Sequence, residues 1–183
     1  MNVAEIKYFD IANGAGVRTT VFVSGCRHRC PGCFNEEAWD FAVGEPFTEE
    51  VENKIFESLE PPYVDGLSVL GGEPLEPENQ HELAPFLERV RERFPNKDIW
   101  MWTGFVFEDL LLDASRAHTQ DLSRVLACVD VLVDGPFILA QKDITLRFRG
   151  SANQRILDLK TSLEKGGPCL WSDGPLLSSH GLQ

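Results

Sequence analysis

Short apolar runs that end in small or turn-forming residues recur along this chain, and they constrain its fold more than any other feature. They cover residues 17–24, 67–70, 99–102 and 129–133, and they run into Gly25, Gly71, Thr103 and Asp134. Runs of this length and composition indicate buried strands. Segments of helical spacing lie between them, so the order predicts a parallel sheet with right-handed crossovers.

Two of the intervening segments carry apolar residues at clear helical spacing, at positions 51, 55 and 59 and at positions 83, 87, 90 and 94. Thr48 is the expected N-cap of the first helix. Pro85 lies inside the second pattern, which predicts that this helix begins near Pro85 or kinks there. Residues 107–112 and 122–126 indicate two shorter helical pieces, and residues 156–159 a last short strand.

The length of the chain limits how large the sheet can be. A complete barrel of eight strand–helix units needs about 250 residues, whereas this chain has 183. We therefore expect an α/β fold with a partial parallel (β/α) barrel in a single domain, residues 1–165. Residues 166–183 are rich in Gly, Pro and Ser and are expected to form a flexible C-terminal tail. Functional residues should gather at the carboxyl ends of the strands.

The charge balance argues against a nucleic-acid partner. The chain has 17 Lys and Arg against 29 Asp and Glu, a net charge of −12, which repels phosphate backbones. No basic segment followed by an apolar run opens the chain, and no apolar stretch reaches about 18 residues, so we expect a cytoplasmic protein without a membrane partner. Two local basic clusters, residues 27–29 and the arginines of 147–155, are either solvated faces or docking surfaces.

The cysteines indicate a metal or redox site. Three of the five cysteines, Cys26, Cys30 and Cys33, have the spacing C-x3-C-x2-C, while Cys128 and Cys169 stand alone, which is not a disulfide framework. Soft thiolates at this spacing can wrap one metal centre, and three ligands leave one iron of a 4Fe–4S cluster open. Structural zinc, which prefers four closed ligands, is the alternative from the cysteines alone.

With Gly71-Gly72-Glu73-Pro74 after the second strand, this cysteine motif resembles the signatures of the radical S-adenosylmethionine enzymes. The resemblance implies a partial barrel of that type, a 4Fe–4S cluster on the three cysteines and S-adenosylmethionine bound beside it. Many members place an aromatic residue before the third cysteine, where this chain has Gly32, and Phe34 follows instead. The cofactor-binding residues implied are Gly32, Cys33, Phe34, Gly71, Gly72, Glu73, Pro74 and Thr103. The alternative for residues 71–74 is an ordinary turn between strand and helix.

A narrower resemblance covers residues 8–160. The segments GVR (16–18), CPGCFN (30–35), DGPF (134–137) and RFRGSANQR (147–155) are similar to those of the activating proteins of anaerobic ribonucleoside-triphosphate reductases. It implies a radical S-adenosylmethionine oxidoreductase that generates a glycyl radical on the reductase. It also implies an electron donor such as flavodoxin or ferredoxin, and no catalytic group beyond the cluster and the cofactor. Arg147, Arg149 and Arg155 are the predicted docking contacts.

Two other functions stay open at this level. One is a different radical enzyme, acting on another glycyl radical enzyme or on a small molecule. The other is a non-catalytic binding module held together by a metal.

Overall fold

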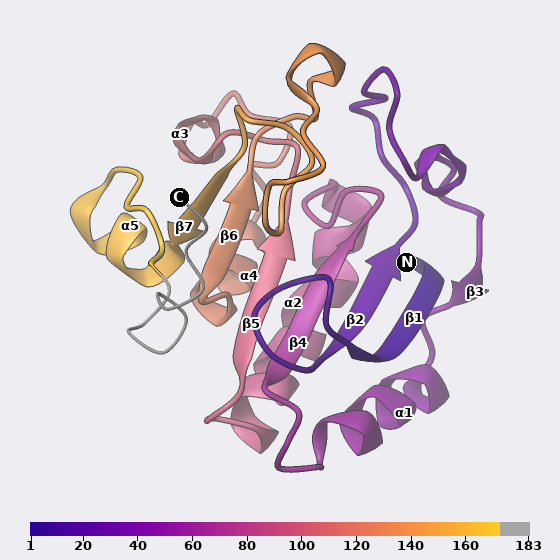
Figure 1. Cartoon of the computed structure of the whole chain (residues 1–183). Coiled ribbons are helices and arrows are strands. Elements are labelled where there is room, and N and C mark those ends of the chain that lie inside the picture. Colours follow the sequence, from indigo (N-terminus) through magenta and orange to yellow (C-terminus); the bar gives the residue numbers. More distant parts are fainter. Residues whose placement is uncertain (173–183) are drawn as a thin grey trace.

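A computed structural model describes residues 1–172, and it places one seven-stranded mixed sheet beside five α-helices (Figure 1). The strands are β1 Asn2–Asp10, β2 Arg18–Val23, β3 Glu45–Pro46, β4 Gly66–Gly71, β5 Asp98–Trp102, β6 Val131–Asp134 and β7 Arg155–Asp158. The helices are α1 Glu49–Leu59, α2 Pro77–Arg93, α3 Phe107–Leu110, α4 Leu122–Cys128 and α5 Leu159–Lys165. Two short 3-10 helices, η1 Glu36–Trp39 and η2 Leu139–Gln141, lie in the connections.

The centre of the sheet is parallel, as the sequence predicts. The strand order is β3-β1-β2-β4-β5-β6-β7, and β2, β4, β5 and β6 pair in parallel. These are the four apolar runs of the sequence, and their carboxyl ends therefore meet at one edge. The α/β class is confirmed, while the closed or partial form of a barrel stays a prediction.

The two margins of the sheet differ from the expected parallel order. β1 pairs antiparallel with β2, and β7 pairs antiparallel with β6. Parallel neighbours need a crossover of about a dozen residues or more, whereas residues 11–17 turn the chain directly back from β1 into β2. Residues 135–154 likewise stay at the carboxyl end of β6 before β7 returns. The sequence did not reveal β1, because only Val3 of this strand is buried and the strand contains no apolar run.

The first two helices begin where capping chemistry allows. The Thr48 side chain accepts a hydrogen bond from the Val51 backbone N–H, which confirms it as the N-cap of α1. α2 begins at Pro77, not near Pro85, because a proline at the first helical position has no backbone N–H to leave unpaired. Pro85 stands inside this helix.

Both faces of the sheet are covered. In Figure 1, α2 and α4 lie behind the sheet and pack against each other, while loop 11–17 crosses in front of β4. The main core lies between the sheet and its helices, and a second cluster on the other face is centred on the fully buried Trp100. Trp102, Phe148 and Trp171 surround Trp100 with ring centroids 4.9–5.8 Å away. Every residue of β2 is buried, the polar Arg18, Thr19 and Thr20 included.

The chain after α5 runs back along the last strand. Gly166 ends α5 in the left-handed conformation, and the Trp171 N–H donates to the Ile156 carbonyl of β7. The expected flexible tail of residues 166–183 stays a prediction, since residues 173–183 lie outside the described part of the chain. No helix in residues 1–172 is long and apolar enough to cross a membrane.

Candidate functional site

The cysteine loop leaves the carboxyl end of β2 and is fixed at its base by backbone hydrogen bonds. The Gly25 N–H donates to the Ala38 carbonyl (2.8 Å), and the Cys26 N–H donates to the Trp39 carbonyl (3.1 Å). Further along, the Cys33 N–H donates to the Cys30 carbonyl (3.1 Å), which closes a tight turn around Pro31 and Gly32. The loop therefore holds its first and third cysteines by separate local contacts.

The three thiols of this loop are free and differ in their surroundings. Burial raises the pKa of the Cys26 thiol to about 11, and burial also raises the pKa of Cys30. The Asn35 backbone N–H lies 3.4 Å from the Cys33 sulfur and donates to it. Buried thiols with raised pKa values stay protonated at neutral pH, so binding of a metal centre must displace their protons.

Gly71 and Gly72 bring the end of β4 against the base of the cysteine loop. The Gly72 N–H donates to the Val23 carbonyl (2.7 Å), and the Glu73 N–H donates to the Gly25 carbonyl (2.8 Å). A Cβ at Gly71 would lie 2.5 Å from the backbone of Val23, and a Cβ at Gly72 would lie 2.5 Å from the backbone of Gly25. Gly71 also has a φ of +126°. Only glycine permits this close approach of the two backbone segments.

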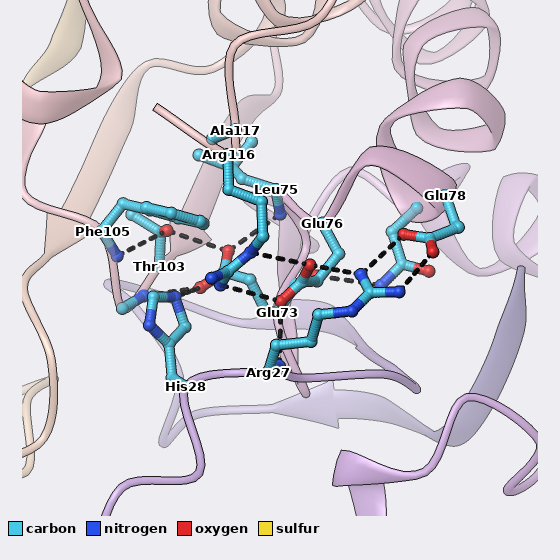
Figure 2. A network of polar contacts seen from close by, with 12 residues as sticks. Arg27, His28, Glu73, Leu75, Glu76, Glu78, Thr103, Phe105, Arg116 and Ala117 are labelled. Atoms are coloured by element: carbon cyan, nitrogen blue, oxygen red, sulfur yellow. Dashed lines mark hydrogen bonds and ion pairs between the residues drawn. The ribbon is translucent and has the colours of Figure 1, made fainter. Parts of the chain in front are cut away.

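The Glu73 carboxylate joins the ends of β4 and β5 (Figure 2). It is 1% exposed, and its Oε1 accepts from the Leu75 N–H (2.8 Å) and from the Thr103 hydroxyl (2.8 Å). Its Oε2 accepts from the Gly104 N–H (2.7 Å). Glu73 and Thr103 are therefore bonded to each other, and any contact of either side chain with a cofactor would add to these bonds.

The carboxyl ends of the four parallel strands converge on one cavity of about 120 Å³. Of the residues singled out in the sequence, those that line it are Cys26, Cys30, Cys33, Phe34, Gly71, Gly72, Glu73 and Thr103. Pro74 is buried outside the lining, and Gly32 lies in an adjoining groove of about 370 Å³. The groove and the cavity share Cys33, Phe34 and Trp102, so they form one continuous hollow.

Several lining residues were not predicted to be there. Trp102 was expected in the core with Trp100, yet it lines the cavity, with its Nε1–H donating to the Phe148 carbonyl (2.7 Å). His28, Trp39, Phe137 and Gln154 also line it. Phe137 and Gln154 belong to the DGPF and RFRGSANQR segments, so those motifs were the available signal. Nothing in the local sequence marks Trp39.

The hollow offers a suitable donor set for an iron–sulfur cluster. Three free thiols line it, and two buried ring nitrogens, Nε2 of His28 and Nε1 of Trp39, have no hydrogen-bond partner in residues 1–172. Within those residues, no group of three His, Cys, Asp or Glu side chains stands close enough to hold a single metal ion. The thiols thus share a cavity without meeting at one point.

The three arginines predicted to dock a partner have unequal surroundings. Arg155 is bound within the chain: its guanidinium pairs with the buried Asp134 and with Glu108, and these bonds raise its pKa. Arg149 donates to the Gln154 carbonyl (2.8 Å). Arg147 is exposed and lies over the Phe148 ring, 4.8 Å from its centroid. Asp134 and Arg155 therefore connect the ends of β6 and β7.

Comparison with known proteins identifies the family. Residues 12–157 match the family described as "4Fe-4S single cluster domain". The chain is 42% identical to the anaerobic ribonucleoside-triphosphate reductase-activating protein of Pasteurella multocida, over 85% of this chain and 96% of that protein. It is 40% identical to the Escherichia coli K12 protein of the same name, over 87% of this chain and all of that protein. The chain belongs to this family of activating proteins.

The activating-protein family extends beyond bacteria. The activating protein of Enterobacteria phage T4 is 38% identical to this chain, over 85% of the chain and 93% of the phage protein. The match to the 4Fe-4S family, over residues 12–157, covers the cysteine loop, all four parallel strands and the segment of residues 147–155. The resemblance drawn from the sequence motifs is confirmed.

Proposed function

We propose that this chain activates an anaerobic ribonucleoside-triphosphate reductase through a 4Fe–4S cluster on Cys26, Cys30 and Cys33 and through S-adenosylmethionine bound beside it. The observation that carries the proposal is the convergence of the three cysteines, Gly71-Gly72-Glu73 and Thr103 on one hollow. The names of the relatives and the 4Fe–4S family support the same activity.

The chain's own residues bind and orient the cluster and the cofactor. The three thiolates hold the cluster, and the Asn35 N–H stabilises the negative charge on the Cys33 sulfur. Gly71 and Gly72 let the end of β4 pack against the backbone of β2 and of the cysteine loop, and Glu73 lies beside them with its carboxylate held by the segment after β5. When bound, the cluster and S-adenosylmethionine would supply one-electron cleavage of the cofactor's C5′–S bond and with it the radical chemistry that activates a glycine of the reductase.

The adjoining groove is the proposed path of the reductase's glycine-bearing loop. It opens beside Phe34 and Ile144, whose side chains are 84% and 91% exposed, and it is continuous with the cavity at Cys33. A partner loop seated there would cover apolar surface and exclude water from the radical. Glycine suits this role because it has no side chain to block the approach.

We further propose a low-potential donor such as flavodoxin or ferredoxin as the electron source, and a cytoplasmic setting. Free thiols at all five cysteines support a reducing compartment.

The decisive experiment is anaerobic. The reconstituted, reduced protein is mixed with S-adenosylmethionine and the reductase, and 5′-deoxyadenosine and the glycyl radical are measured by chromatography and by electron paramagnetic resonance. We expect both products. Absence of 5′-deoxyadenosine would contradict the proposed chemistry, whereas 5′-deoxyadenosine without a glycyl radical would point to a different substrate.

Arg149, which lines the groove, and its near neighbour Arg147 give a second prediction. Arg147→Ala combined with Arg149→Ala should lower the rate of glycyl radical formation about 2- to 30-fold, because each partly exposed charge contributes roughly 0.2–1 kcal/mol to an ion pair. Cluster content and 5′-deoxyadenosine formation without the reductase should not change. Both are measured on the same preparation.

The matched control removes two exposed charges elsewhere, Lys54→Ala with Arg93→Ala on α1 and α2, and it should leave the rate unchanged. Arg155→Ala is not combined with the other two substitutions, because it would leave the buried Asp134 unpaired and destabilise the fold. Equal rates in the control and the Arg147/Arg149 variant would remove these arginines from the docking surface.

A further inference from the structure

The first half of the cysteine loop is attached to the segment after β4 through Arg27 (Figure 2). The Arg27 backbone N–H donates to Glu76 Oε1 (2.9 Å), and its guanidinium donates to Glu76 Oε2 (2.7 Å). The same guanidinium donates to Glu78 (2.9 Å) and lies over the Phe41 ring, 4.5 Å from its centroid. The residue next to Cys26 is thus bound by both its backbone and its side chain.

Glu76, which receives these bonds, is fully buried at the start of α2. Arg116, from the chain between α3 and α4, donates to it with Nε (3.2 Å) and Nη2 (3.0 Å). Arg116 also lies over the Phe105 ring, 5.0 Å from its centroid. A buried carboxylate between two guanidinium groups is a fixed anchor, because it accepts charge-assisted hydrogen bonds from both of them away from water.

His28 makes the second attachment. Its ring lies edge-on to Phe105 with centroids 4.5 Å apart, and a Cβ at Gly104 would approach the ring Cδ2 to 2.7 Å. Its Nε2 is 3.0 Å from Glu73 Oε2, although the two atoms are not aligned for a hydrogen bond. The ring therefore fills a slot at the end of β5 by packing and by its proximity to the Glu73 carboxylate.

The second half of the loop is held differently. Arg29 has an exposed side chain and a φ of +48°, and Pro31 and Gly32 are exposed as well. Two bonds of this half run within the loop itself, from the Cys33 N–H to Cys30 and from the Asn35 N–H to the Cys33 sulfur, and one contact comes from outside, from the Phe137 backbone N–H to the Cys30 thiol. Arg29 therefore provides a control within the same loop.

From this asymmetry we infer that Arg27 and His28 are positioning residues, which fix Cys26 in its ligand-binding place before iron arrives. Every contact of the attachment joins protein groups, from the loop to Glu73, Glu76, Glu78 and Phe105. The inference rests on the proposed function only in taking Cys26 as a cluster ligand. In this order of cluster binding, Cys26 is already in place before iron arrives, and residues 29–33 close around the cluster afterwards.

The test uses full-length, metal-free protein under anaerobic conditions. Hydrogen–deuterium exchange of residues 26–30 is measured by mass spectrometry in the wild type and in Arg27→Ala, His28→Ala and Arg29→Ala. We expect exchange at least about tenfold faster in the first two variants and unchanged in Arg29→Ala. Arg27→Lys should give an intermediate rate, because a single ammonium keeps a contact with Glu76 but not the forked pairing.

Cluster assembly gives the second readout. Arg27→Ala and His28→Ala should take up iron and sulfide several-fold more slowly, with a broadened paramagnetic signal of the reduced cluster, while their thermal unfolding midpoints identify any general loss of folding. Exchange in both variants equal to wild type, or fast exchange in the metal-free wild type, would overturn the inference. A wild type that binds no iron would instead contradict the proposed function, and the exchange data would still decide the positioning role.

Discussion

Alanine at Cys26, Cys30 or Cys33 is expected to remove most of the bound iron and all formation of 5′-deoxyadenosine. Each of the three thiols lines the same cavity, and a cubane that has only three protein ligands cannot lose one of them without exposing a second iron. Iron and acid-labile sulfide per chain are measured after anaerobic reconstitution, together with the electron paramagnetic resonance signal of the reduced cluster.

The chain provides its own controls for these variants. Cys128 is buried in the main core and Cys169 lies near α5, so Cys128→Ala and Cys169→Ala should keep full iron content. Cys128→Ala should cost only a little stability, since it removes a small apolar group. A wild-type protein that carries one tightly bound zinc and no sulfide would contradict the cluster assignment.

Loss of the Glu73 carboxylate is expected to have the second large effect, on both folding and cofactor binding. Glu73→Ala would leave the Leu75 N–H, the Gly104 N–H and the Thr103 hydroxyl without their buried acceptor. An unsatisfied buried donor costs about 1–3 kcal/mol, so we expect the free energy of unfolding to fall by at least about 3 kcal/mol. Affinity for S-adenosylmethionine should fall about 10- to 150-fold, the value of a lost charge-assisted hydrogen bond.

Two further variants separate these effects. Glu73→Gln keeps the shape of the side chain and one acceptor oxygen, but its NH₂ group would face one of the N–H or O–H groups that now donate to the carboxylate. This variant should therefore be destabilised less than Glu73→Ala. Glu82→Gln changes an exposed carboxylate further along α2 and should leave cofactor affinity unchanged. Urea unfolding measures stability, and calorimetric titration of the reconstituted protein measures binding. Unchanged calorimetric binding in Glu73→Gln and Glu73→Ala would exclude Glu73 from the cofactor site.

The parallel centre of the fold could be predicted from the sequence because its signals are local. The central strands are buried on both faces, so each contains a run of apolar residues, and Gly, Thr or Asp follows each run. The antiparallel margins could not be predicted in this way. Whether β1 and β7 turn back or cross over depends on the course of residues 11–17 and 135–154, which carry no periodic pattern.

The features of the site likewise divide into those that short segments of sequence predict and those that only the fold decides. The spacing of the three cysteines and the Gly71-Gly72 pair identified the chemistry, since ligand spacing and backbone freedom are properties of short segments. The sequence by itself determined the cysteine motif that we propose as the cluster ligands, the strand ends beside it and the family. Only the tertiary structure decided that Arg155 is bound to Asp134, that Thr103 bonds to Glu73, and that Arg27 and His28 fasten the loop. These partners lie some 20 to 50 positions apart in the chain, and a side chain's hydrogen bonds depend on distances of about 3 Å that folding alone sets.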